Sequence, residues 1–189
     1  MRRYAKSHFD NIKQSLAAME KYMEIWDAYN PDGTLAGIDL VRGEPIPDGL
    51  YFMTVEILVR HTDGDYLLMQ RDMRKPAFPG FFEATAGGAG QKGERPLGAA
   101  FRELREETGI VTDHLEPIAH MLYEKHRMLN YQYLCVTDCK KDSITLQDGE
   151  TVGYKWVGED EFIAFINSGN MIPTQRERYD PYFKKLGYV

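Results

Sequence analysis

Residues 96–108 constrain the fold most, because they predict a helix with two chemically different faces. Pro96 suits the first helical position, and Gly109 suits the residue that ends a helix. At about 100° per residue, Glu106 and Glu107 fall about 60° and 40° to either side of Glu103. Three carboxylates therefore share one face. A separate apolar stripe suits packing on a sheet, and it comprises Leu97, Ala100, Phe101, Leu104 and Thr108.

The rest of the chain predicts strands gathered around this helix. Residues 26–29 and 35–41 flank a turn and predict a hairpin, and strands are expected at 51–60, 66–71, 116–124, 131–137 and 152–157. Further helices are expected at 3–23, 159–167 and 182–186. This mixture indicates the α+β class. The 189 residues fit one domain, at 26–189, with residues 1–25 as an N-terminal helical extension.

Charge and composition exclude several functions. Net charge is −6, so the chain lacks the basic footprint of a protein that binds duplex nucleic acid. Its apolar runs are too short to span a membrane, and no secretory signal follows Met1. Cys135 and Cys139 have no zinc-like spacing. From these absences we expect a cytoplasmic protein. An acidic chain that binds a phosphorylated ligand needs local basic residues or a bridging metal.

The acidic helix face has two interpretations. It is either a solvated surface or a site for a divalent cation. Glu103 and Glu107 form a like-charge pair one turn apart, which costs a few tenths of a kcal/mol. A cation would turn that cost into affinity, and hard carboxylate oxygens favour Mg²⁺ or Mn²⁺.

Residues 88–110 resemble the Nudix box. They place a glycine, five residues, a glutamate and seven residues before Arg102-Glu103-Leu104-Arg105-Glu106-Glu107-Thr108-Gly109-Ile110. Looser similarity extends over residues 48–165. The resemblance implies a Nudix fold, with a mixed β-sheet sandwiched between helices in α/β/α layers. It also implies a divalent-metal-dependent pyrophosphohydrolase that cleaves a diphosphate linkage in a nucleoside diphosphate derivative or a related phosphorylated metabolite.

The same resemblance implies roles for individual residues. Arg102 and Glu94 would orient the metal ligands. Water would attack phosphorus, and the carboxylate that takes its proton would be Glu107 or, as second choice, Glu150. The implied ligands of Mg²⁺ or Mn²⁺ are Glu103, Glu106, Glu107 and the backbone carbonyl of Gly88.

Other positions keep two interpretations each. Arg71 and Lys75 either hold the diphosphate or are ordinary surface charges, and the same choice applies to the basic residues 125–127. Phe78, Phe81 and Phe82 either stack on a base or, as we favour, pack in the core or anchor a loop.

Residues 26–110 are most similar to relatives of isopentenyl diphosphate isomerase. However, the catalytic cysteine of that enzyme falls on Gly87 and its histidine on Ala89. Without the thiol we favour a hydrolase. The alternative from another class is a non-catalytic module that senses a nucleotide. The apolar stripe of residues 3–23 needs a partner, for which we favour a second copy in a homodimer.

Overall fold

The computed structural model describes residues 24–189. The helix predicted at 3–23 lies outside the described residues, and the homodimer that depends on it stays a prediction. The elements, in chain order, are β1 (Ile25–Tyr29), β2 (Leu35–Val41), β3 (Phe52–His61), β4 (Tyr66–Arg71), β5 (Phe82–Glu83), β6 (Thr85–Ala89), α2 (Pro96–Thr108), β7 (Glu116–Tyr123), the 3₁₀ turn η1 (Glu124–His126), β8 (Met128–Thr137), β9 (Thr151–Val157), α3 (Glu159–Asn167) and α4 (Pro173–Leu186).

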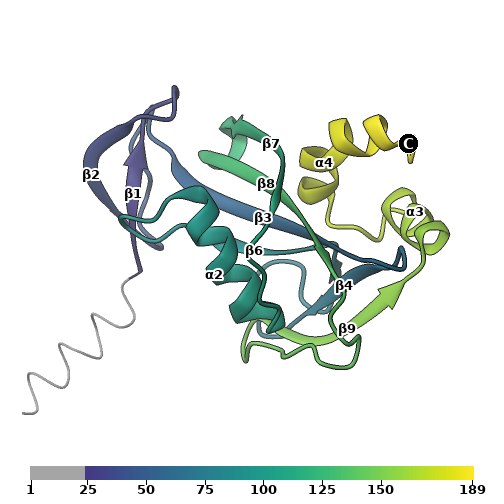
Figure 1. The fold of residues 1–189 in the computed structure, drawn as a ribbon. Helices are drawn as coiled ribbons and strands as arrows, with labels where there is room; N and C mark the ends of the chain where they lie inside the picture. Colours follow the sequence, from purple (N-terminus) through teal and green to yellow (C-terminus); the bar gives the residue numbers. More distant parts are fainter. Residues whose placement is uncertain (1–23) are drawn as a thin grey trace, which may run out of the picture.

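Seven of the strands form one mixed sheet. Its path is β5-β4-β3-β8-β7, with β6 paired to β3 and β9 paired to β4. Strands β3 and β8 run parallel, and the other pairs are antiparallel. Strands β1 and β2 form a separate antiparallel pair, which confirms the predicted hairpin (Figure 1).

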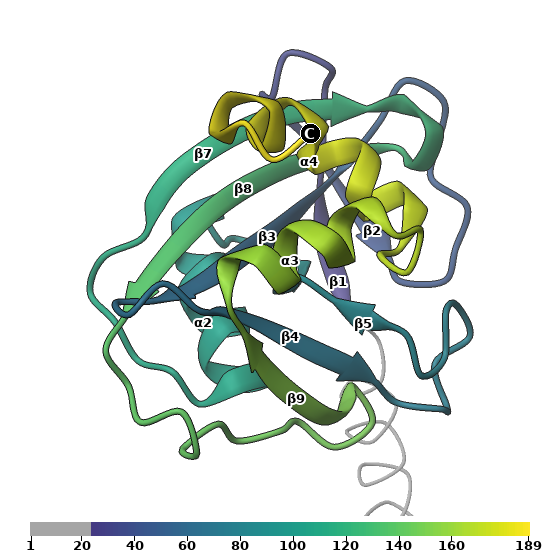
Figure 2. The same ribbon diagram turned by 90° about the vertical axis from the view of Figure 1, so that its right-hand side faces the viewer.

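Strand β3 divides the core in two, because its side chains alternate between the faces of the sheet. On one face Val55 and Ile57 pack with Leu104 of α2. On the other face Leu58 packs with a cluster from α3 and α4 that includes Phe162, Ile166, Tyr179 and Phe183. Helix α2 therefore covers one face and α3 with α4 the other (Figures 1 and 2). This arrangement is the predicted α/β/α sandwich.

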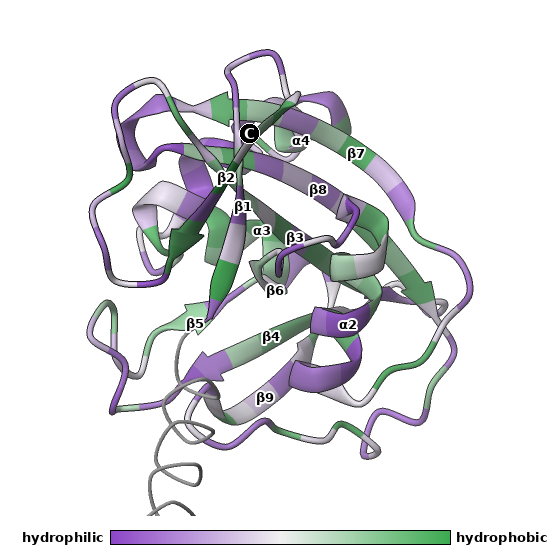
Figure 3. Ribbon diagram, turned by 90° about the vertical axis from the view of Figure 1, so that its left-hand side faces the viewer, coloured by the Kyte–Doolittle hydropathy of each residue, from purple (hydrophilic) through white to green (hydrophobic). Residues whose placement is uncertain are grey.

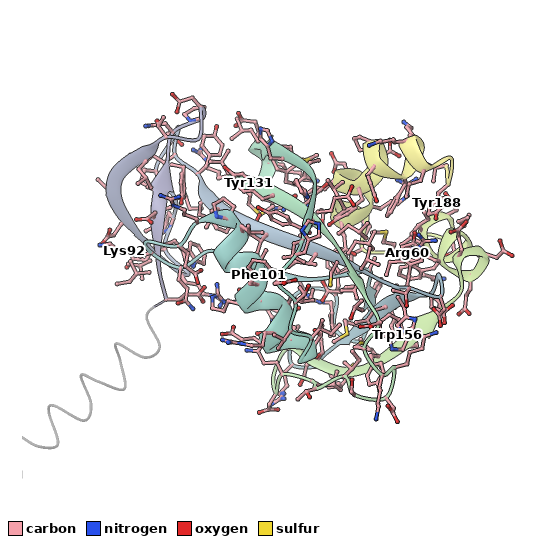
Figure 4. All side chains as sticks on the ribbon, viewed as in Figure 1. Arg60, Lys92, Phe101, Tyr131, Trp156 and Tyr188 are labelled. Carbon is pink, nitrogen blue, oxygen red and sulfur yellow. The ribbon has the colours of Figure 1, made fainter. Side chains whose placement is uncertain are left out.

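Helix α2 matches its prediction at both ends. Pro96 opens it, and Gly109 ends it with φ of 74°. Its hydrophilic side faces the viewer in Figure 3, away from the sheet. The predicted apolar stripe is wrong at Leu97, which is 44 % exposed, because the core cluster takes its α2 members only from Ala99 onward.

The short helix predicted at 182–186 is the end of the longer α4. Pro181 lies inside this helix, where it removes one backbone donor, and such a proline normally signals a break. None of the helices within residues 24–189 is long and apolar enough to cross a membrane.

Candidate active site

A cavity of about 520 Å³ lies where α2, the glycine-rich end of β6, and strands β3 and β8 meet. Polar side chains from these elements and from the loops after β4 and before β9 line its wall. Apart from Glu94, which contacts Arg102 from outside the lining, the residues to which the resemblance or the spacing gave a role line this cavity, namely Arg71, Lys75, Gly88, Arg102, Glu103, Glu106, Glu107 and Glu150.

Arg102 organises the carboxylates of α2. Its Nε and Nη2 donate to the two carboxylate oxygens of Glu94, at 2.8 and 2.9 Å. Its Nη1 donates to Glu103 Oε1 at 2.7 Å and to Glu106 Oε2 at 3.1 Å. The guanidinium lowers the pKa of Glu94. The geometry is what an orienting role for Arg102 and Glu94 requires, because one planar fork fixes three carboxylates.

Glu103 is pressed against the backbone of β6. A Cβ atom on Gly88 would lie 2.6 Å from Glu103 Oε1, so only glycine leaves room for this carboxylate. Burial raises the pKa of Glu103, and the adjacent Arg102 opposes the rise. A buried carboxylate with a raised pKa is one for which a further cation would stabilise the charge.

Glu107 is the most deeply placed carboxylate of the set. Its Oε2 accepts a hydrogen bond of 2.9 Å from the backbone N–H of Gly87. Burial raises its pKa well above the ordinary value, and the negative charge of Glu83 adds to the rise. Glu106, by contrast, has a side chain that is 37 % exposed. The acidic face of α2 therefore has a buried carboxylate, Glu107, and a carboxylate in contact with water, Glu106.

Arg71 and Lys75 are two basic residues that line the same cavity as the carboxylates. Arg71 Nη1 donates to Glu83 Oε1 at 2.7 Å, and Lys75 forms an ion pair with Glu150. Their side chains are 17 % and 15 % exposed. Cations that are this enclosed and that line a cavity are not ordinary surface charges, so the geometry favours the ligand-binding interpretation.

The three carboxylates of α2 are each bonded to a group of the protein. Among residues 24–189, no three acidic, histidine or cysteine side chains converge as a metal centre does. Glu103 and Glu106 are both bonded to Arg102, and Glu107 is bonded to Gly87. The metal ligands named from the resemblance thus stay a prediction.

Several lining residues were missed from the sequence. They include Glu56 of β3, Glu83 of β5, Asn130 of β8 and Arg178 of α4. A carboxylate inside the apolar run of β3 was a usable signal for Glu56, because charged residues are rarely buried without a function or a partner. Arg178 had no signal, since the helix that carries it was predicted only from residue 182.

The phenylalanines after β4 lie away from the cavity. Phe78 and Phe81 are 36 % and 42 % exposed and contact each other edge to face, with ring centroids 5.5 Å apart. Both forms of the favoured interpretation occur: Phe78 and Phe81 contact each other within the loop, whereas Phe82 packs on the α3 and α4 cluster. Of the basic residues 125–127, Arg127 pairs with Asp48 and none lines the cavity.

Known proteins are similar to this chain in sequence and in fold. An uncharacterised Nudix hydrolase of Listeria monocytogenes is 29 % identical over 151 residues, which covers 80 % of this chain and 89 % of the relative. A Nudix hydrolase of Deinococcus radiodurans is 26 % identical, over 69 % of this chain and 77 % of the relative. Among solved structures, a Deinococcus radiodurans protein superposes with a TM-score of 0.64 at 24 % identity, covering 77 % of this chain and 90 % of its own. A MutT protein of Methanosarcina mazei gives 0.58 at 20 % identity, covering 71 % and 94 %.

Fold and relatives define the class of protein: a pyrophosphohydrolase that acts on nucleoside diphosphate derivatives. The NUDIX domain model matches residues 50–181, and the chain belongs to the Nudix family.

Proposed function

We propose that this hydrolase depends on Mg²⁺ or Mn²⁺ and that the acidic face of α2 holds the ion. The ligands would be the carboxylates of Glu103, Glu106 and Glu107 with the backbone carbonyl of Gly88. The donor set fits the ion, because it consists only of hard oxygen atoms. Gly88 fits this role too, because the lack of a Cβ lets the Glu103 carboxylate lie against the backbone of β6.

The single observation that carries the proposal is the burial of several like charges in one cavity. Glu83, Glu103 and Glu107 all have pKa values raised, first of all by burial. Acids that are crowded and desolvated in this way are typical of functional sites, because folding alone gains nothing from them. A divalent cation would offset their repulsion.

When bound, the ion would neutralise phosphate oxygens and lower the pKa of a coordinated water. The chain's own residues do the rest. Arg71 and Lys75 bind the diphosphate oxygens, and Arg102 keeps the carboxylates oriented. Glu107 is our first choice to take the proton from the attacking water, and Glu150 is the second. Because Glu150 is paired with Lys75, a phosphate that recruits Lys75 would release Glu150 for that role.

The test is turnover on a panel of nucleoside diphosphate derivatives with Mg²⁺ or Mn²⁺. The panel includes ADP-ribose, nucleotide sugars, dinucleoside polyphosphates, coenzymes and oxidised nucleoside triphosphates. Wild type and Glu106→Gln run side by side, with phosphate release coupled to a phosphatase where needed. We expect turnover that needs the metal and falls in the variant. Folded, metal-loaded wild type that turns over nothing would instead support a nucleotide-sensing module.

A further inference from the structure

The part of the cavity lined by strands β3 and β8 is called its floor here. The floor carries a second set of polar groups, besides those on the acidic face of α2. Strands β3 and β8 run parallel in register, so that Phe52 lies beside Met128, Thr54 beside Asn130, and Glu56 beside Gln132. All but Gln132 line the cavity. The floor therefore changes along the strands from an apolar row, through a neutral hydrogen-bonding row, to a charged row.

The charged row is completed by α4. Arg178 Nε donates to Glu56 Oε2 at 3.1 Å, and Arg178 Nη2 donates to Glu56 Oε1. The two side chains are only 11 % and 10 % exposed. The guanidinium also lies over the ring of Tyr123, 5.6 Å from its centroid. Arg178 is thus fixed in place, while its Nη1 makes no hydrogen bond to any other residue in 24–189.

The neutral row, Thr54 and Asn130, also contains donor groups that make no hydrogen bond within residues 24–189. Asn130 Nδ2 donates one of its two protons to Thr54 Oγ1 at 3.0 Å, and Asn130 Oδ1 accepts from Gln132 Nε2 at 3.1 Å. One amide proton of Asn130 and the hydroxyl proton of Thr54 remain. With Arg178 Nη1, three donors share the floor of one cavity.

We propose that Thr54, Asn130 and Arg178 form a specificity subsite for the group joined to the diphosphate. The subsite would take an oxygen-rich, hydroxyl-bearing group of the sugar type. An alkyl group there would leave three donors desolvated without acceptors, and a site built to hydrogen-bond rejects an analogue that lacks the matching atoms. This inference rests on the proposed diphosphate site. It distinguishes the substrate of this chain from the alkyl diphosphates used by the isomerase branch that residues 26–110 resemble.

The experiment measures binding without turnover, by calorimetry on the full chain in metal-free buffer. The probes are ADP-ribose, isopentenyl diphosphate and inorganic diphosphate. Wild type is compared with Thr54→Val, which replaces the hydroxyl by a methyl group and so also removes the acceptor of Asn130 Nδ2. It is also compared with Arg178→Lys, which keeps the positive charge but loses the planar, two-pronged guanidinium. Arg176→Lys is the matched control, because Arg176 lies on the same helix but bonds to Asp180 and the carbonyl of Ile166, outside the cavity.

We expect wild type to bind ADP-ribose at least tenfold more tightly than isopentenyl diphosphate. Arg178→Lys should weaken ADP-ribose by about tenfold, and Thr54→Val by several-fold. Neither variant should change the affinity for inorganic diphosphate. A variant that only damaged the structure would lower the affinity for inorganic diphosphate as well. Equal losses for all probes, no loss in either variant, or a wild-type preference for isopentenyl diphosphate would overturn the inference. Because binding is read without catalysis, these outcomes are separate from failure of the proposed hydrolysis.

Discussion

Helices α2 and α4 are built alike, yet they serve the cavity in different ways. Each begins at a proline and ends at a glycine with φ of 74°. Each contributes one largely enclosed arginine to the same cavity, and the two helices pack on opposite faces of the sheet. Arg102 is held by Glu94, whereas Arg178 is held by Glu56. Only α2 also contributes carboxylates to the cavity. Under our proposals, α2 therefore carries the groups for the chemistry, and α4 carries a group that selects the ligand.

Removing a carboxylate of α2 is the largest expected effect. Glu107→Gln keeps the shape of the side chain but loses the charge and the capacity to take a proton. We expect kcat to fall by about 10²–10⁴-fold, the range for a positioned acid or base. The measurement is steady-state turnover of the best panel substrate, with circular dichroism to check folding. Glu116→Gln, an exposed position on β7, is the control and should keep wild-type activity. Wild-type kcat in Glu107→Gln would remove this glutamate from the mechanism.

Removing either arginine tests which helix depends more on its ion pair for stability. Arg178→Met leaves Glu56 buried without a partner, and breaking a buried pair costs about 3–5 kcal/mol. Arg102→Met also leaves Glu103, which is 11 % exposed, without its partner. The other two partners, Glu94 and Glu106, are 24 % and 37 % exposed and keep contact with water, so we expect a smaller cost of about 1–3 kcal/mol. Urea unfolding of both variants gives the two free energies. The reverse order would contradict the difference in burial described for the two pairs.

The two terminal glycines give a closely matched pair. A Cβ at Gly109 would lie 3.0 Å from Thr145 Oγ1, whereas a Cβ at Gly187 would meet no atom within 4 Å. A left-handed residue other than glycine costs about 1–2 kcal/mol, so both alanine variants should be destabilised. Gly109→Ala should lower the free energy of unfolding more than Gly187→Ala does, because the contact with Thr145 adds to the backbone strain. Equal free energies of unfolding would show that Thr145 moves aside at no cost.

The smallest expected effect is the pH dependence of stability that comes from the ion pairs of Asp180 in α4. The Asp180 carboxylate accepts hydrogen bonds from Lys184 at 2.6 Å and from Arg176 at 2.8 Å, and these partners lower its pKa. Because the folded-state pKa is depressed, the stabilisation is present above the unfolded-state value of about 4 and is lost as pH falls. Wild type should therefore exceed Asp180→Asn in stability at pH 6, and the difference should shrink as pH falls below about 4. If the stability difference between wild type and Asp180→Asn grew as pH falls, the predicted direction of the pKa shift of Asp180 would be wrong.

The contrast between α2 and α4 also explains what the sequence could predict. Helix α2 was readable because its start, its stop and its apolar spacing agree, and because the box fixes the spacing of Glu103 from Gly88. Helix α4 was hidden by Pro181, and its buried side chains Gln175, Tyr179 and Phe183 are separated by charged residues. The partner of Arg178 is Glu56, which is distant in sequence, so only the packing of α4 on β3 brings the two together.

The metal site is the central claim, and titration with Mn²⁺ followed by electron paramagnetic resonance tests it most directly. Wild type is compared with Glu103→Gln, Glu106→Gln and Glu107→Gln, and Arg178→Lys serves as a variant in the same cavity but outside the ligand set. We predict that each glutamine variant weakens Mn²⁺ binding by about tenfold or more, and that Arg178→Lys binds as wild type does. Wild-type affinity in all three glutamine variants would contradict the account.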